Sequence, residues 1–209
     1  GPGDILVRIG DDGSREAIKL SAPAAWGIKL SLNGSVKLEL VDGSSTFHDV
    51  PASHWAADAI NFVVSRSLFL GGDNGFYPSA EMSRAMLFTV LARLDGVDIS
   101  GGISWYSNAV DWAQTAGISD GTAPEELITR EQFVVMLYRF VNAEPVTADL
   151  TVFSDHNVIS DWALEAMHWA VREGILIGDS ENRLNPSSPL SRAEAAVMIQ
   201  RLVSYILEH

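Results

Sequence analysis

The chain carries a helical pattern of apolar and polar positions that occurs three times from residue 46 onward. Each copy begins at a tryptophan, with a small residue 4 positions on and an aromatic residue 7 positions on. These offsets lie on one face of a helix, so each tryptophan marks the start of an amphipathic helix. A glycine 16 positions on ends that helix and permits a turn. The tryptophans are Trp55, Trp105 and Trp162, and the glycines are Gly71, Gly121 and Gly178.

A second amphipathic pattern follows in each copy, headed by a hydroxyl residue and an arginine. The pairs are Ser83-Arg84, Thr129-Arg130 and Ser191-Arg192. Serine and threonine are good N-caps because their side-chain oxygen accepts from a free backbone N–H. The unit is therefore predicted as helix, glycine turn, loop and capped helix. A repeat that cannot bury its own face shares a core with its neighbours, so we predict a mainly α, pseudo-threefold domain whose arginine-headed helices meet at the axis.

The loops differ between the copies. From glycine to arginine they span 13 residues in the first copy, 9 in the second and 14 in the third. The first and third copies have Phe-x-Asp ahead of the tryptophan, ending at Asp49 and Asp155. The second copy lacks that motif, and Asp98 is a weak substitute for its aspartate.

Residues 1–45 have a strand-like pattern instead. Residues 28–32 and 36–40 alternate apolar and polar side chains around Asn33-Gly34-Ser35, which predicts a β-hairpin. Residues 5–9 and 17–20 are further strand candidates. We interpret this segment as the end of a preceding β domain or as a linker that folds onto its neighbour. The predicted boundaries are 1–45 for the β-rich segment and 46–96, 97–146 and 147–209 for the three repeats.

The composition of the chain excludes several kinds of site and partner. The 209 residues include no cysteine, which excludes disulfides, thiolate metal sites and cysteine nucleophiles. A formal charge of −13 argues against a nucleic-acid partner, and no apolar run is long enough for a membrane helix. No signal peptide is present, and Gly1-Pro2-Gly3 looks like a cloning remnant, so we interpret the chain as a fragment. We expect no cofactor and no metal.

Several short motifs recur in the three copies: Phe47-His48-Asp49-Val50-Pro51 with His54-Trp55-Ala56, Phe153-Ser154-Asp155 with Trp162-Ala163, Met82-Ser83-Arg84-Ala85, Ile128-Thr129-Arg130-Glu131 and Leu190-Ser191-Arg192-Ala193-Glu194. Together they resemble the motifs of the S-layer homology (SLH) family, which anchors bacterial surface proteins to the cell wall. The resemblance covers residues 46 to about 204. The signature glutamate is kept only as Glu194, with Met86 and Gln132 in its place elsewhere.

The resemblance implies a function and a set of site residues. It implies a monomeric pseudo-trimer at the bacterial cell surface whose grooves bind secondary cell-wall polysaccharide linked to peptidoglycan, often with pyruvate-ketal sugars. The residues that it nominates for the glycan are Arg84, Arg130, Arg192, Asp49, Asp155, Trp55, Trp162, Gly71, Gly178, Ser83, Thr129, Ser191 and Glu194. Because the middle repeat departs most from the family pattern, we expect at least one altered or silent groove.

The residues leave alternatives open. The signature arginines either contact ligand or form structural ion pairs, and the three leading tryptophans either pack in the core or face a sugar. We rank Arg84 and Arg192 above Arg130 for binding, unless Arg130 serves a groove whose aspartate comes from another repeat. A protein-interaction module is a second possible function. An enzyme is a third, but carboxylate pairs such as Asp161 with Glu165 do not repeat, so we expect no catalytic residues.

Overall fold

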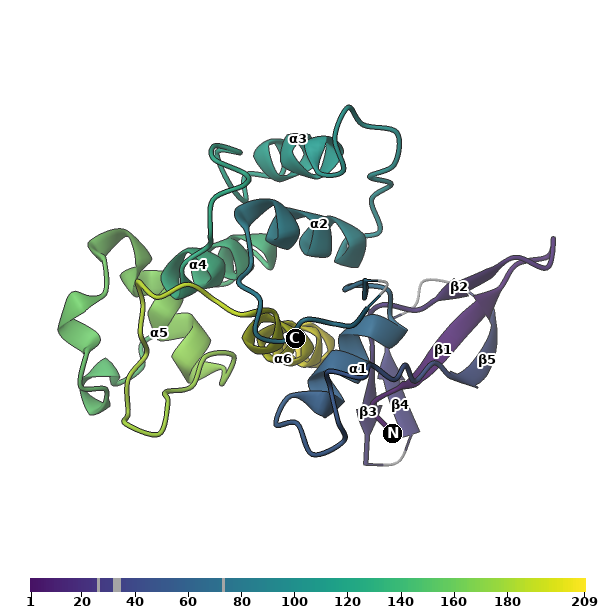
Figure 1. Ribbon diagram of the computed structural model, residues 1–209, viewed down its shortest axis with the longest axis horizontal. Coiled ribbons are helices and arrows are strands. Elements are labelled where there is room, and N and C mark those ends of the chain that lie inside the picture. Colours follow the sequence, from purple (N-terminus) through teal and green to yellow (C-terminus); the bar gives the residue numbers. More distant parts are fainter. Residues whose placement is uncertain (26, 32–34, 73) are drawn as a thin grey trace. The chain divides into compact units, whose positions relative to one another are not determined.

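The computed structural model describes residues 1–25, 27–31, 35–72 and 74–209. These residues form two compact units (Figure 1). The first unit comprises residues 1–80 and 192–209, and the second comprises residues 81–191. The first repeat therefore contributes to both units, since its second helix lies in the second unit. The repeat boundaries given above stay a prediction.

The amino-terminal strands of the first unit form two small antiparallel sheets. Strands β1 (Asp4–Ile9), β2 (Arg15–Ala17) and β5 (Lys37–Asp42) form one sheet in the order β2-β1-β5. Strands β3 (Ser21–Ala24) and β4 (Gly27–Leu30) form the other. Alternation along β1 turns Ile5 and Val7 inward, where both are buried.

The predicted hairpin is wrong in its pairing. Strand β4 pairs with β3, and β5 pairs with β1 over six residue pairs from Asp4↔Asp42 to Ile9↔Lys37. The turn residues Asn33 and Gly34 lie outside the described residues. Pairing with β1 places β5 beside the strand that carries the buried Ile5 and Val7, so a long-range contact overrides the local hairpin signal.

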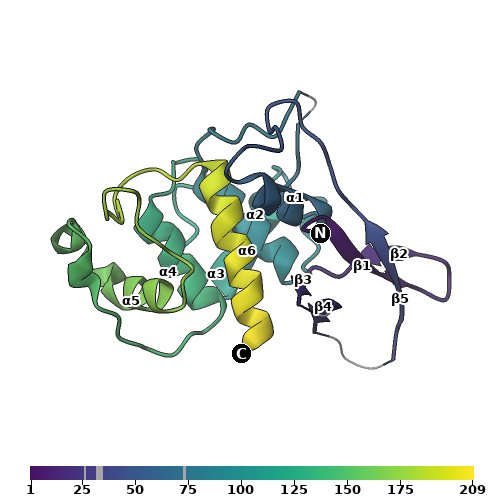
Figure 2. The ribbon, with the colours of Figure 1, turned by 90° about the horizontal axis from the view of Figure 1, so that it is seen from below.

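These strands are anchored to helices of the first unit. Helix α1 (Ala57–Ser65) packs against α6 (Arg192–Glu208), and β1 and β3 contact α1 and α6 respectively (Figure 2). Arg66, which follows α1, is fully buried beneath the strands and donates to the carbonyl oxygens of Pro2, Asp4 and Ser21. The amino-terminal segment therefore folds onto the first repeat, as one of the two interpretations expected.

The second unit contains two pairs of helices. Helix α2 (Arg84–Leu94) packs against α3 (Ser107–Thr115), and α4 (Arg130–Phe140) packs against α5 (Leu164–Arg172) (Figure 1). Three short 3₁₀ turns precede α5: η1 (Leu150–Val152), η2 (His156–Val158) and η3 (Asp161–Ala163). Each pair joins the arginine-headed helix of one repeat to the tryptophan-headed helix of the next. The α6–α1 pair completes this cycle within the first unit.

A closed ring of backbone hydrogen bonds lies in the second unit, at the entrances to the arginine-headed helices. Met82 N–H donates to the Leu190 carbonyl (2.8 Å), Leu190 N–H to Ile128 (3.1 Å) and Ile128 N–H to Met82 (2.9 Å). All three side chains are fully buried. Each residue stands two positions before a signature arginine, so the three segments are related by pseudo-threefold symmetry. The predicted mainly α fold of three repeats with an amino-terminal β segment is confirmed.

Candidate functional site

Each signature arginine binds a loop of the next repeat. Arg84 Nε donates to the Thr122 carbonyl at 2.9 Å, and Arg130 Nε to the Leu184 carbonyl at 2.8 Å. Arg192 Nε closes the series by donating to the Phe76 carbonyl of the first repeat at 2.8 Å. We call each arginine with its acceptor loop residue a junction: the Arg84, Arg130 and Arg192 junctions.

The three loops share a backbone shape at the junctions although their lengths differ. The residue after each carbonyl acceptor has positive φ and is followed by proline: Tyr77 (59°) before Pro78, Ala123 (46°) before Pro124, and Asn185 (52°) before Pro186. Each proline carbonyl accepts from the N–H of the residue after the arginine, at 2.7–2.9 Å. The loop therefore satisfies donors that a helix N-terminus leaves unpaired, and its carbonyl oxygens offset the unfavourable position of a cation at that end.

Asp49 binds the backbone of Phe76, the loop residue whose carbonyl also accepts from Arg192. Its carboxylate accepts from the backbone N–H of Phe76 at 3.0 Å and of Tyr77 at 2.7 Å. Burial of Asp49 opposes its ionisation, but these two N–H donors outweigh burial and keep the pKa of Asp49 below its usual value. Asp155 repeats the arrangement on Leu184 and Asn185, at 2.9 and 2.7 Å. The Phe-x-Asp aspartates thus fix the loops that the arginines bind.

The Arg192 guanidinium lies in a partly desolvated setting made of neutral groups. Nε and one terminal nitrogen donate to the carbonyls of Phe76 and Leu70, and the cation lies 4.5 Å from the centre of the Phe76 ring. Burial lowers the pKa of Arg192, although the charge of Asp49 opposes this shift. Among the described residues Arg192 forms no ion pair, so its charge is not neutralised by a direct carboxylate contact.

The nominated glycines and helix caps have structural roles at the junctions. A Cβ on Gly71 would collide with the ring of Phe47, and one on Gly178 with the ring of Phe153, so both glycines seat the phenylalanine of Phe-x-Asp. The Thr129 hydroxyl accepts from Gln132 N–H while the Gln132 side chain accepts from Thr129 N–H, a capping box. The signature glutamate position is therefore a capping position. Ser83 caps α2 by the first of these bonds alone, its hydroxyl accepting from Met86 N–H, and Ser191 and Glu194 hold these positions at α6.

The leading tryptophans are not in the core, contrary to the first of their two interpretations. Trp55, Trp105 and Trp162 are 67%, 58% and 56% exposed. No hydrogen bond of the described residues involves Trp55 or Trp162, so these rings are not joined to the arginines and aspartates by such bonds. We expected Trp112 and Trp169, seven positions after a leading tryptophan, to lie in the core. Trp169 is buried, but Trp112 is only half-buried and its Nε1 donates to the Asp95 carboxylate at 3.2 Å. The exposed rings offer apolar surface of the kind that a sugar face can cover.

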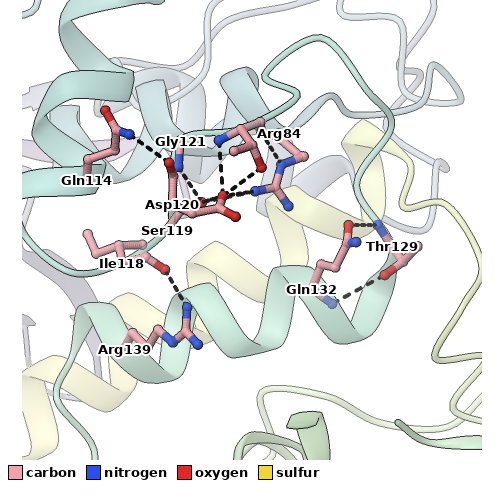
Figure 3. A network of polar contacts seen from close by, with 10 residues as sticks. Arg84, Gln114, Ile118, Ser119, Asp120, Gly121, Thr129, Gln132 and Arg139 are labelled. Carbon is pink, nitrogen blue, oxygen red and sulfur yellow. Dashed lines mark hydrogen bonds and ion pairs between the residues drawn. The ribbon is translucent and has the colours of Figure 1, made fainter.

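The Arg84 junction differs from the Arg192 junction (Figure 3). Its guanidinium forms an ion pair with Asp120 at 3.0 Å and also donates to the Ser119 hydroxyl. Asp120 accepts from Thr122 N–H at 3.0 Å, and Thr122 is the residue whose carbonyl Arg84 binds. Asp120 therefore replaces the missing Phe-x-Asp aspartate. Asp98, the substitute considered from sequence, instead accepts from Ser100 N–H.

These contacts bear on the exception attached to the expected ranking of the arginines, and the ranking for binding stays a prediction. Arg130 meets the long loop and Asp155 of the third repeat, whereas Arg84 meets the short second loop. The stated exception, in which Arg130 uses an aspartate of another repeat, is the arrangement found. The departures of the middle repeat therefore affect Arg84 rather than Arg130.

The described residues contain no group of three or more histidine, aspartate or glutamate side chains placed to hold a metal ion. They also contain no helix with the length and apolar character needed to cross a bilayer.

Comparison with known proteins adds to this geometry. The family model of the S-layer homology domain matches residues 46–85, 98–134 and 153–196. The chain is 31% identical over 177 residues to an amylopullulanase of Thermoanaerobacterium thermosulfurigenes, covering 76% of this chain and 9% of the relative. It is 29% identical over 176 residues to an S-layer protein of Bacillus thuringiensis subsp. finitimus, covering 75% of this chain and 21% of the relative. The chain thus spans between 9% and 21% of the length of these two relatives.

Proposed function

Because the chain belongs to the S-layer homology family, we propose that it is a non-catalytic module that binds secondary cell-wall polysaccharide and so anchors a larger protein at the bacterial surface. The Arg192 junction is the observation that carries this proposal. There a half-buried cation is held in place by neutral acceptors. Such a cation is suited to an acidic group on an otherwise neutral sugar.

The chemistry favours a carboxylate as the group recognised. Two of the three Arg192 nitrogens are fixed by carbonyl oxygens, and this orients the planar guanidinium before any ligand arrives. Partial burial strengthens an attraction that water weakens at an exposed site. A pyruvate ketal supplies one carboxylate on a neutral ring, which a preoriented guanidinium binds by charge-assisted hydrogen bonds.

The relatives that are enzymes do not change this assignment. The matched segment is 9% of the amylopullulanase and 16% of an exoglucanase XynX of Acetivibrio thermocellus. One carboxylate of the pair considered from sequence, Glu165, accepts from the Tyr138 hydroxyl at 2.7 Å. Burial of the Tyr138 hydroxyl, together with its hydrogen bond to Glu165, raises the pKa of Tyr138 to about 12. We propose that the chain acts as a monomer, with any catalysis placed elsewhere in a longer protein.

Sedimentation with purified cell-wall sacculi tests the proposal. We expect the parent chain to sediment with intact sacculi and to remain in solution when acid has stripped the wall polymer. Arg192→Ala should weaken binding at least tenfold, and Arg192→Lys nearly as much, because lysine keeps the charge but loses the planar fork. Arg172→Lys is the matched control, since the exposed Arg172 binds, among the described residues, only the Thr147 carbonyl. Equal binding to stripped sacculi would instead favour a protein or peptidoglycan partner.

A further inference from the structure

One repeated position distinguishes the junctions. It lies 15 residues after each leading tryptophan and holds Leu70, Asp120 and Ile177. Leu70 and Ile177 are each 55% exposed, and the Asp120 side chain is 68% exposed. Exposed large apolar side chains at two copies and a carboxylate at the third are not explained by packing.

The residue at this position accepts a hydrogen bond from the junction arginine at Arg192 and at Arg84. The Leu70 carbonyl accepts from Arg192 at 2.9 Å, which leaves the apolar Leu70 side chain exposed beside the cation. The Asp120 carboxylate accepts from the corresponding nitrogen of Arg84 at 3.0 Å. The same position therefore provides a backbone acceptor in one junction and a charged side chain in the other.

We propose that the residue at this position decides whether a junction accepts an external carboxylate, and that Asp120 is a built-in carboxylate that closes the Arg84 junction. This inference rests on the proposed function and deepens it. The chain then presents unequal sites for an acidic sugar, with Arg192 open and Arg84 closed.

Hydrogen bonds hold the Asp120 carboxylate at Arg84, where the carboxylate of a ligand would otherwise bind. One of its oxygens accepts from Arg84, from Thr122 N–H and from the Thr122 hydroxyl, the last at 2.9 Å. The Arg84 side chain is only 12% exposed, whereas Asp120 is the exposed partner of the pair. Figure 3 shows the two charged groups pointing toward each other. The hydrogen bonds from Thr122, followed by the charge of Arg84, lower the pKa of Asp120, which keeps it ionised at neutral pH.

An acidic sugar meets two obstacles at this junction. It must displace a carboxylate whose local concentration is fixed by the chain itself, or it must bind beside that carboxylate against like-charge repulsion. Among the described residues no carboxylate is bonded to Arg192, because Asp49 is bound to two backbone N–H groups instead. An acidic sugar therefore displaces no ion pair at Arg192 and meets only the charge of the non-bonded Asp49.

Exchanging the residues between junctions tests the inference. The probe is a synthetic methyl glycoside that carries one pyruvate ketal, and the readout is the NMR shift of the Arg84 and Arg192 Nε–H groups. The variants are Asp120→Leu, which installs the residue of the first repeat, Asp120→Asn, which keeps an acceptor for Thr122 N–H, and Leu70→Asp. Asp111→Asn is the charge control, because Asp111 is an exposed acid on the same repeat.

We expect the probe to shift Arg192 but not Arg84 in the parent and in Asp111→Asn. Both Asp120 variants should add a response at Arg84, and Leu70→Asp should weaken the response at Arg192 at least tenfold. Asp120→Asn guards against a loop that fails to fold, since retention of its Arg84 Nε–H signal reports the bond to Thr122.

The outcomes separate the two proposals. If Arg192 responds but Arg84 responds equally in the parent, or stays silent in both Asp120 variants, the inference is overturned and the proposed function stands. An undiminished Arg192 response in Leu70→Asp also overturns the inference alone. If neither arginine responds in any variant while the chain is folded, recognition of the ketal carboxylate and the inference built on it both fall.

Discussion

Two arginines of this chain show how differently a guanidinium can be used. Arg192 is half-buried and donates to neutral carbonyl oxygens, and the side chains of Leu70 and Tyr77 in the loop that it binds are exposed. Arg66 is fully buried and donates only to neutral oxygens, four of them backbone carbonyls, with its charge 3.8 Å from the centre of the Phe62 ring. Burial lowers the pKa of Arg66 to about 10. Its hydrogen bonds to the carbonyls of Pro2, Asp4 and Ser21 fix the amino-terminal segment to the first repeat.

We therefore expect Arg66→Leu to reduce the free energy of unfolding by about 3 kcal/mol, because the substitution leaves several buried carbonyl oxygens without donors. Urea denaturation followed by circular dichroism measures the change. Arg8→Leu is the control: Arg8 forms an exposed ion pair with Glu16, and such pairs contribute about 1 kcal/mol or less. Equal losses in the two variants would show that the bonds of Arg66 do not stabilise the unit.

The loops are the elements that build the junctions. Each combines a residue at positive φ, a proline and a carbonyl aimed at an arginine, so the loop and the next helix N-terminus satisfy each other's polar groups. Tyr77 and Asn185 take positive φ although they carry a Cβ, which costs about 1 kcal/mol at such a position. The bonds from their N–H groups to Asp49 and Asp155 offset that cost.

The loop of the first repeat should respond to acid through Asp49. The folded-state pKa of Asp49 lies below its usual value, so its contribution is fully present above the unfolded pKa of about 3.9 and is lost as pH falls through the lower folded value. We expect Asp49→Asn to be less stable than the parent at pH 7. The two free energies of unfolding should converge as the pH is lowered below about 4. Urea titrations across this range measure the convergence, and a difference that does not change with pH would contradict the assignment.

At the scale of the molecule, the helices pack in pairs that each join two different repeats. Each arginine-headed helix packs on the tryptophan-headed helix of the next repeat, and α6 packs on α1. The ring through Met82, Ile128 and Leu190 fixes the register of the three segments within the second unit. Every junction is consequently built from two repeats, so a change in one repeat alters the site of its neighbour.

The charge of the molecule predicts an unusual salt response. Residues 46–209 contain nine arginines, 21 acids and no lysine, a formal charge of −12. This background repels an anionic polymer, and salt screens the repulsion over about 8–10 Å. Arginine contacts in a partly buried junction are screened less. Calorimetry with acidic wall saccharide should therefore give an affinity that is unchanged or slightly higher at about 0.15 M salt than at lower ionic strength. A steep loss of affinity with salt would indicate diffuse charge attraction.

The amino-acid sequence was enough to define the repeats, the helices, the capped starts of α2 and α4 and the absence of disulfide chemistry. These features depend on neighbours close in the chain: the helical period is read over a few residues, and a cap binds an N–H three positions on. The family signature belongs to the same class, because its residues are contiguous.

Only the tertiary structure showed which residues and strands distant in the chain pair with one another. Phe76 and Arg192 are separated by 116 positions, and nothing in either segment specifies the other. The sequence pointed to a hairpin where β5 pairs with β1, and it offered only Asp98, a weak substitute, where Asp120 serves. It also left the exposure of Trp55, Trp105 and Trp162 open. The reason is the same in each case: burial and long-range hydrogen bonds depend on which faces meet when the chain closes, and a local pattern records only that a face exists.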